Sequence, residues 1–176
     1  VALGALAPAG VAAADPVLDE SDRFFLDMAT EACRSGDFPA FLWPFANSRV
    51  VRDRYTGPQV ESGVEGRTEK VAARAYLDRD AFPIAMMDYS YVTGESQRAF
   101  DAPGGGDPSR LVYVEVTFNT AQDERQRVDW VPGRFETGEG DGPGTLIEAT
   151  GPGGHLLFYP TSECWQLVAD VRNRGR

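Results

Sequence analysis

Residues 38–48 of the chain read FPAFLWPFANS, and this stretch decides the fold. Asp37 precedes it with a short acidic side chain that can cap a helix, and Pro39 falls in the first turn, where proline is tolerated. The apolar residues recur at helical spacing: Phe38, Phe41, Leu42 and Phe45. We predict a short helix, kinked or loosened at Pro44, whose aromatic face must be covered by another element.

A longer helix is predicted directly upstream. Asp19 or Ser21 can cap its N-terminus, and Gly36 suits the left-handed conformation that ends many helices. Its apolar residues form two rows on one face: Phe24, Phe25, Met28, Ala29, Ala32 and Cys33. The two helices together form a hairpin with an aromatic face that needs a sheet to cover it.

Downstream of the hairpin, the pattern changes to short strands separated by turn residues. The clearest strand is 111–118, LVYVEVTF, in which apolar and other residues alternate, and a turn at 121–124 joins it to a strand at 127–131. Further strands are predicted at 49–56, 84–93, 145–150, 155–159 and 164–172. The segment 68–82 fits an extended piece followed by a short helix near 73–80, and 101–109 and 137–144 fit glycine-rich loops. No internal repeat or linker divides the chain, so 15–176 is predicted to be one α+β domain.

The composition excludes several kinds of partner. The chain has 176 residues, with 17 basic and 27 acidic side chains and a net charge of −10. A nucleic-acid or anionic membrane partner would need a clustered positive surface, so neither is expected. We also expect no membrane span, because the apolar run at the N-terminus is too short to cross a bilayer.

That N-terminal run, residues 1–14, reads VALGALAPAGVAAA and carries no charge. Ala12 and Ala14 are placed for cleavage before Asp15, so the run fits the remnant of a signal peptide whose true start lies upstream. The protein would then be periplasmic or secreted. The alternative is an unstructured tail on a cytosolic protein.

The chain has two cysteines, Cys33 and Cys164. They are too few and too far apart for a zinc site or a redox motif, and we expect no metal and no cofactor. An oxidising compartment would let them pair as a disulfide. Two buried free thiols are the alternative.

No catalytic signature is present: the sequence has no nucleophile elbow, phosphate-binding loop, zinc-binding helix motif or dinucleotide fingerprint. The candidate catalytic residues are Asp88, Glu115, Tyr91 and the single histidine, His155. A carboxylate in an aromatic pocket would have a raised pKa, and a tyrosine could donate a hydrogen bond to a developing oxyanion. Alternatively, these polar residues simply occupy the solvent-facing positions of alternating strands.

A family resemblance rests on the order of the elements and on a few residues. These are Phe41, Phe45, Ala46 and Ser48, leading into 51–55 (VRDRY), and 165–167 (WQL) near the end. The chain resembles the nuclear transport factor 2-like superfamily, and within it the uncharacterised exported bacterial branches. The resemblance implies that the helical hairpin packs on a curved, mainly antiparallel sheet, a cone-like roll that encloses a pocket. Enzymes of this class use an Asp/His or Asp/Tyr pair there, and many members have no known catalysis.

Three functions follow as hypotheses. The first is an exported, non-catalytic module that binds a small apolar molecule or a protein partner in or around the pocket. Its predicted lining is aromatic: Phe41, Phe45, Tyr89, Tyr91, Tyr113 and Trp130. The second is a lyase or isomerase with a pocket carboxylate and tyrosine, and the third is a structural envelope subunit that forms a homodimer through its sheet.

Overall fold

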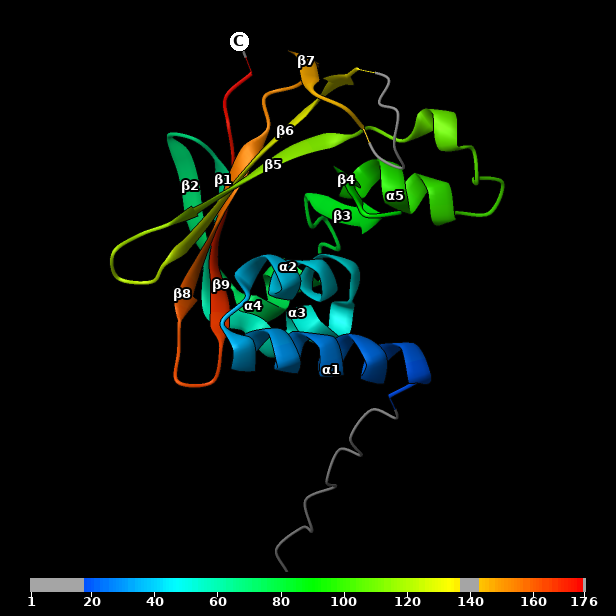
Figure 1. The fold of residues 1–176 in the computed structure, drawn as a ribbon. Coiled ribbons are helices and arrows are strands. Elements are labelled where there is room, and N and C mark those ends of the chain that lie inside the picture. The colour runs from blue at the N-terminus through cyan, green and yellow to red at the C-terminus, as the bar shows by residue number, and fades with distance from the viewer. Residues whose placement is uncertain (1–17, 137–142, 176) are drawn as a thin grey trace, which may run out of the picture.

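The structure is a computed structural model that describes residues 18–136 and 143–175. Helices and a hairpin pack against one face of a twisted sheet, whose strands bend over them (Figure 1). The predicted signal-peptide remnant, 1–14, lies outside the described residues, as does most of the loop predicted at 137–144. The domain boundary predicted at Asp15 is likewise untested and stays a prediction.

The two predicted N-terminal helices are confirmed. α1 (Glu20–Ser35) is capped by Asp19, whose side chain accepts a hydrogen bond from the Asp22 N–H at 2.8 Å. Gly36 ends it with a φ of 70°, which a residue with a side chain would adopt only with strain. α2 (Phe38–Asn47) continues through Pro44, which lies buried inside it.

Phe24 departs from the prediction. It was expected on the buried face of the hairpin, but it is 56% exposed. The N-terminal turns of α1 extend beyond the sheet (Figure 1), and the Phe24 side chain there stays largely exposed, with the Phe25 ring 5.6 Å away. The other aromatic residues of the hairpin stripe behave as predicted, and Phe41 and Phe45 are 0% exposed.

The predicted strand at 49–56 is wrong, because this segment forms α3 (Arg49–Tyr55). Ser48 caps the helix by accepting a hydrogen bond from the Val51 N–H at 3.4 Å. Val51 and Tyr55, four residues apart, lie buried on the same side. The β-branched valines suggested a strand, but packing against the core outweighs that weak local preference.

The main sheet has the order β2-β1-β9-β8-β6-β5, and β7 also pairs with β6. Its strands are β1 (Thr56–Val64), β2 (Arg67–Ala72), β5 (Val114–Thr120), β6 (Gln126–Phe135), β7 (Leu146–Ala149), β8 (Gly154–Pro160) and β9 (Trp165–Arg172). All pairs are antiparallel except β1 with β9. The prediction of an α+β fold with a mainly antiparallel sheet is therefore confirmed.

A small hairpin stands opposite the main sheet. The strand predicted at 84–93 is in fact two strands, β3 (Ile84–Met87) and β4 (Ser90–Thr93). Asp88 and Tyr89 form the turn between them with φ values of 46° and 62°, the backbone of a tight two-residue hairpin turn. No glycine marks this turn, so the sequence pattern concealed it.

Three short helices complete the fold. α4 (Ala73–Leu77) follows β2, as predicted. α5 (Gly94–Asp101) was not predicted; the side chain of Thr93 caps it by accepting from the Ser96 N–H. A 3-10 turn, Pro108–Arg110, lies before β5.

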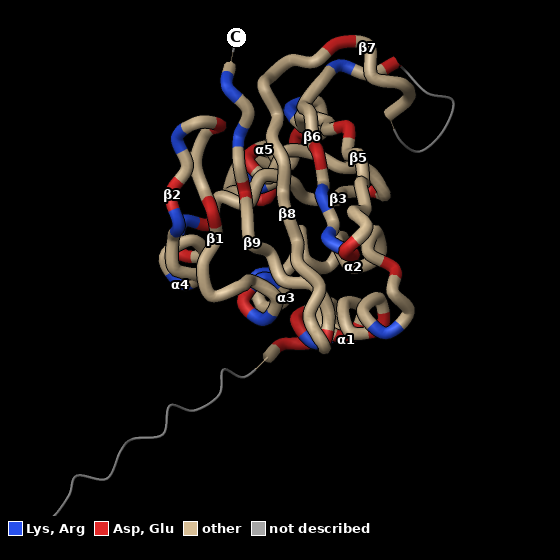
Figure 2. Tube along the Cα trace, turned by 90° about the vertical axis from the view of Figure 1, so that its left-hand side faces the viewer, with Lys and Arg blue, Asp and Glu red and all other residues tan. Residues whose placement is uncertain are grey.

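The core is a cluster of aromatic rings between α2 and the sheet. Phe41 packs with its ring centroid 5.4–6.1 Å from those of Tyr55, Phe158 and Trp165. Cys33 and Cys164 form a disulfide that joins the end of α1 to the segment before β9. β8 carries no charged residue, whereas both signs occur along β2 (Figure 2).

Candidate functional site

Two neighbouring hollows lie along the sheet face that the helices cover. The larger one has a volume of about 400 Å³ and an apolar wall made of Phe82, Pro83, Trp130, Pro132 and Pro152. Its polar lining comes from Thr93, Glu95, Arg98 and Arg172. The smaller hollow has a volume of about 270 Å³ and includes Tyr76, Arg79 and Asp170. Ala81 and Arg172 line both hollows, so they form a shared wall.

Arg172, on β9, is held in this wall by three contacts. Its Nη2 donates to the Ala81 carbonyl oxygen at 3.1 Å, and its Nε lies 3.3 Å from Asp170 Oδ1. Its guanidinium also stacks over the Trp130 ring, 5.0 Å from the centroid. The arginine therefore fixes the position of the ring that forms the floor of the larger hollow.

Gly154 creates the room for this stack. In the register of the sheet it lies between Trp130 on β6 and Arg172 on β9. A Cβ atom at this position would come within 2.5 Å of the Val171 carbonyl oxygen and 3.0 Å of the indole ring. A side chain here would push Trp130 out of the floor of the hollow.

The smaller hollow contains a buried carboxyl group that the sequence analysis missed. Asp170 is 4% exposed, and its Oδ2 accepts a hydrogen bond from the Tyr76 hydroxyl at 2.7 Å. Burial raises the pKa of Asp170, and the nearby Arg172 and Tyr76 only partly oppose that rise. Burial, followed by the charge of Asp170, also raises the pKa of the Tyr76 phenol.

A bulge explains why Asp170 was missed. Simple alternation along 164–172 puts Leu167 and Ala169 on the core face and Asp170 on the other. The pairing shifts between Leu157 and Phe158, which leaves Val168 as an extra residue on β9. Beyond this bulge, Asp170 lies opposite the fully buried Leu156 and faces the helices. The one available signal was an acidic residue within the mainly apolar run 167–171, LVADV.

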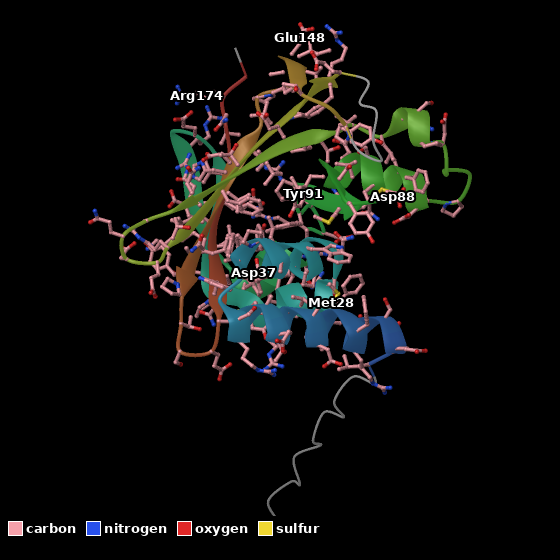
Figure 3. All side chains as sticks on the ribbon, viewed as in Figure 1. Met28, Asp37, Asp88, Tyr91, Glu148 and Arg174 are labelled. Atoms are coloured by element: carbon pink, nitrogen blue, oxygen red, sulfur yellow. A yellow bond between two sulfur atoms is a disulfide. The ribbon has the colours of Figure 1, made fainter. Side chains whose placement is uncertain are left out.

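The structure does not bring the predicted catalytic residues together. Asp88 is exposed at the outer tip of the hairpin, and Tyr91 lies half-buried between the hairpin and the sheet (Figure 3). Burial raises the pKa of the Tyr91 phenol. Glu115 is exposed on β5. His155 is paired with Asp129 and Val171 on neighbouring strands, and burial lowers its pKa, with a further contribution from Arg127.

Among the six predicted pocket residues, Trp130 alone lines either of these two hollows. Phe41 and Phe45 are fully buried in the core, where other rings surround them. Tyr89 is 88% exposed and stands 6.5 Å from the ring of Trp43. The ring of Tyr113 packs edge-on against Phe135, and Tyr91 packs at the edge of the core.

Asp170→Asn is expected to change how stability depends on pH. Because the pKa of Asp170 is raised in the folded chain, the folded state holds this proton more tightly than the unfolded chain does. The resulting stabilisation is complete below about pH 4, which is the pKa of aspartate in an unfolded chain. It is lost as the pH rises through the pKa of Asp170 in the folded chain. The difference in unfolding free energy, wild type minus Asp170→Asn, should therefore fall with rising pH.

Urea titrations at several pH values would measure this difference. Asp107→Asn serves as the control, because hydrogen bonds from Ser109 lower the pKa of Asp107. The unfolding free energy of the wild type minus that of Asp107→Asn should change in the opposite direction. It should rise as the pH rises above the pKa of Asp107 in the folded chain. A pH-independent difference for Asp170→Asn would show that the buried carboxyl titrates as it does in the unfolded chain.

Within the described ranges no group of three or more His, Cys, Asp or Glu residues could hold a metal ion, and no helix there is long and apolar enough to cross a membrane. No protein-family model matches the chain, and no curated protein matches its sequence. Among solved structures, the chain is similar to an NTF-2-like protein of unknown function from Shewanella oneidensis MR-1. The match has 13% identity and a TM-score of 0.32, over 88% of this chain and 98% of the other. At this TM-score and identity the likeness assigns neither a family nor a function.

Proposed function

We propose that this protein is a non-catalytic module that binds a small, mainly apolar molecule in the larger hollow. The observation that carries the proposal is the wall itself: aromatic and proline side chains around about 400 Å³, with the Trp130 ring held by Arg172 as its floor. Small-molecule sites commonly have volumes of about 300–1,000 Å³, a mostly apolar lining and a few fixed polar groups.

The surroundings of Asp170 favour binding over catalysis. One carboxylate oxygen, Oδ2, accepts a hydrogen bond from the Tyr76 hydroxyl, and the other, Oδ1, lies 3.3 Å from Arg172 Nε in an ion pair without a hydrogen bond. A general base needs an oxygen directed at the proton that it removes. Oδ2 is engaged by Tyr76, and Oδ1 accepts no hydrogen bond from the described residues but lies in the ion pair with Arg172 inside the shared wall, so we assign Asp170 a structural role.

Ala81→Phe is expected to weaken ligand binding while the fold is retained. Ala81 is exposed and lines both hollows, so a phenyl ring at this position would occupy space that the ligand needs. We expect affinity for a bound small molecule to fall at least about tenfold, the equivalent of about 1.4 kcal/mol. Native mass spectrometry and calorimetry with a ligand identified by screening would measure the change.

The matched control is Ala121→Phe, which adds the same ring at an exposed position in the β5–β6 turn. It should bind as the wild type does. Equal binding by Ala81→Phe and Ala121→Phe would place the ligand elsewhere and contradict the proposal.

The alternative of a lyase or isomerase is tested at Asp170, the buried carboxyl group of the two hollows, because Asp88 and Glu115 are exposed. Incubation with carbonyl compounds in heavy water tests it. Exchange of hydrogen next to the carbonyl that disappears in Asp170→Asn would favour an enzyme over a binding module.

We also propose that the protein acts after export, in the periplasm or outside the cell. The Cys33–Cys164 disulfide supports this proposal, because such bonds persist in oxidising compartments. Fractionation of producing cells, with detection of the processed N-terminus, would test it; accumulation of unprocessed chain in the cytosol would contradict it.

A further inference from the structure

The two hollows have a charge balance opposite to that of the whole chain. Three arginines line them, Arg79, Arg98 and Arg172, against two acidic residues, Glu95 and Asp170. With all five ionised, this leaves one positive charge in a chain whose net charge is −10. A local excess of positive charge in a partly enclosed site attracts an anion.

Two of these arginines, Arg98 and Arg172, have guanidinium N–H groups that make no hydrogen bond with the described residues. Arg172 donates a hydrogen bond from Nη2 to the Ala81 carbonyl oxygen, its Nε lies 3.3 Å from Asp170 Oδ1 in an ion pair, and its Nη1 makes no hydrogen bond with any described residue. Among the described residues Arg98 makes one side-chain hydrogen bond, from Nη1 to the Phe82 carbonyl oxygen at 3.3 Å. Both line the larger hollow, where their free N–H groups can donate to an anionic oxygen pair.

We infer that the ligand of this site is a small organic monocarboxylate. Its apolar body would lie against Trp130 and the proline wall, and its carboxylate would accept hydrogen bonds from Arg98 and Arg172. The single excess charge and the presence of Glu95 favour a monoanion over a doubly charged phosphate ester. This inference rests on the proposed binding function and adds the chemical class of the ligand.

Matched pairs of probes test the inference on the full chain. Calorimetry would compare benzoate, cinnamate and octanoate with benzyl, cinnamyl and octyl alcohol, which have the same apolar bodies without the charge. We expect at least one carboxylate to bind about tenfold or more tightly than its alcohol, as charge-assisted hydrogen bonds to arginine would give.

Arg98→Gln and Arg172→Gln should each remove most of this preference. Arg98→Gln should leave the affinity for the alcohol nearly unchanged, whereas Arg172→Gln should also lower it. Arg98→Gln is the decisive variant, because Arg172 also holds Trp130. The control, Arg134→Gln, changes an exposed arginine paired with Glu148 on β7 and should behave as the wild type.

The outcomes separate the two claims. If probes bind but no carboxylate binds more tightly than its alcohol, or if Arg98→Gln keeps the preference, the inference is wrong and the proposed binding function stands. If no probe of either kind binds, the proposed function fails, and the ligand class fails with it.

Discussion

Replacing both cysteines with alanine, as Cys33→Ala with Cys164→Ala, is expected to lower the free energy of unfolding by about 5 kcal/mol. The bond closes a loop between residues that are 131 positions apart. In the chain-entropy account, a cross-link over so long a loop removes much of the freedom of the unfolded chain. Since a domain is typically stable by only about 5–15 kcal/mol, this loss would bring the protein close to spontaneous unfolding.

Chemical denaturation in urea would measure the effect, with the oxidised wild type as the reference. The wild type treated with a reductant is the matched control, and it should unfold at nearly the same urea concentration as the double variant. Equal stability of the oxidised wild type and the double variant would show that the bond constrains the unfolded chain far less than its loop length implies.

Phe41→Ala is expected to cost about 3–5 kcal/mol, the range found when a buried phenylalanine is cut back to alanine. Phe41 is 0% exposed and packs against several rings, among them Phe45 at 5.6 Å and Tyr55 at 5.4 Å. The variant would leave a cavity between α2 and the sheet and remove part of the aromatic cluster that holds them together.

Phe24→Ala is the matched control, since it makes the same change on the neighbouring helix. Phe24 is 56% exposed, so its loss should change the free energy of unfolding by no more than about 0.5 kcal/mol. Urea denaturation of both variants would test the pair. Similar losses in the two would mean that the burial of Phe41 contributes little to stability.

The helical hairpin could be predicted because its signals are local. Asp37 and Gly36 mark helix ends through the chemistry of their own positions, and the aromatic stripe indicates which face is buried. The elements that were missed depend on contacts with distant parts of the chain. α3 is a helix because Val51 and Tyr55 find a core to pack against, and the Asp88–Tyr89 turn adopts a left-handed backbone without a glycine.

Less of the candidate site than of the fold could be predicted, because the site also depends on contacts between distant parts of the chain. Trp130 was identified as a pocket residue from its type and strand, and it does line the larger hollow. Asp170 could not be predicted to face inward, because one extra residue in β9 reverses the alternation. The stack of Arg172 on Trp130 depends on three strands coming into register, which no local pattern encodes.

The placement of β9 has a consequence for biosynthesis. Among the described strands of the main sheet, β9 and β1 form the one parallel pair. The other edge of β9 pairs with β8, so the last described strand in chain order occupies an interior position. A nascent chain still attached to the ribosome before residue 172 has emerged would hold β1 and β8 with nothing between them. Assembly of the sheet must therefore wait for the end of translation of this segment, and until then the unpaired edges need protection from aggregation.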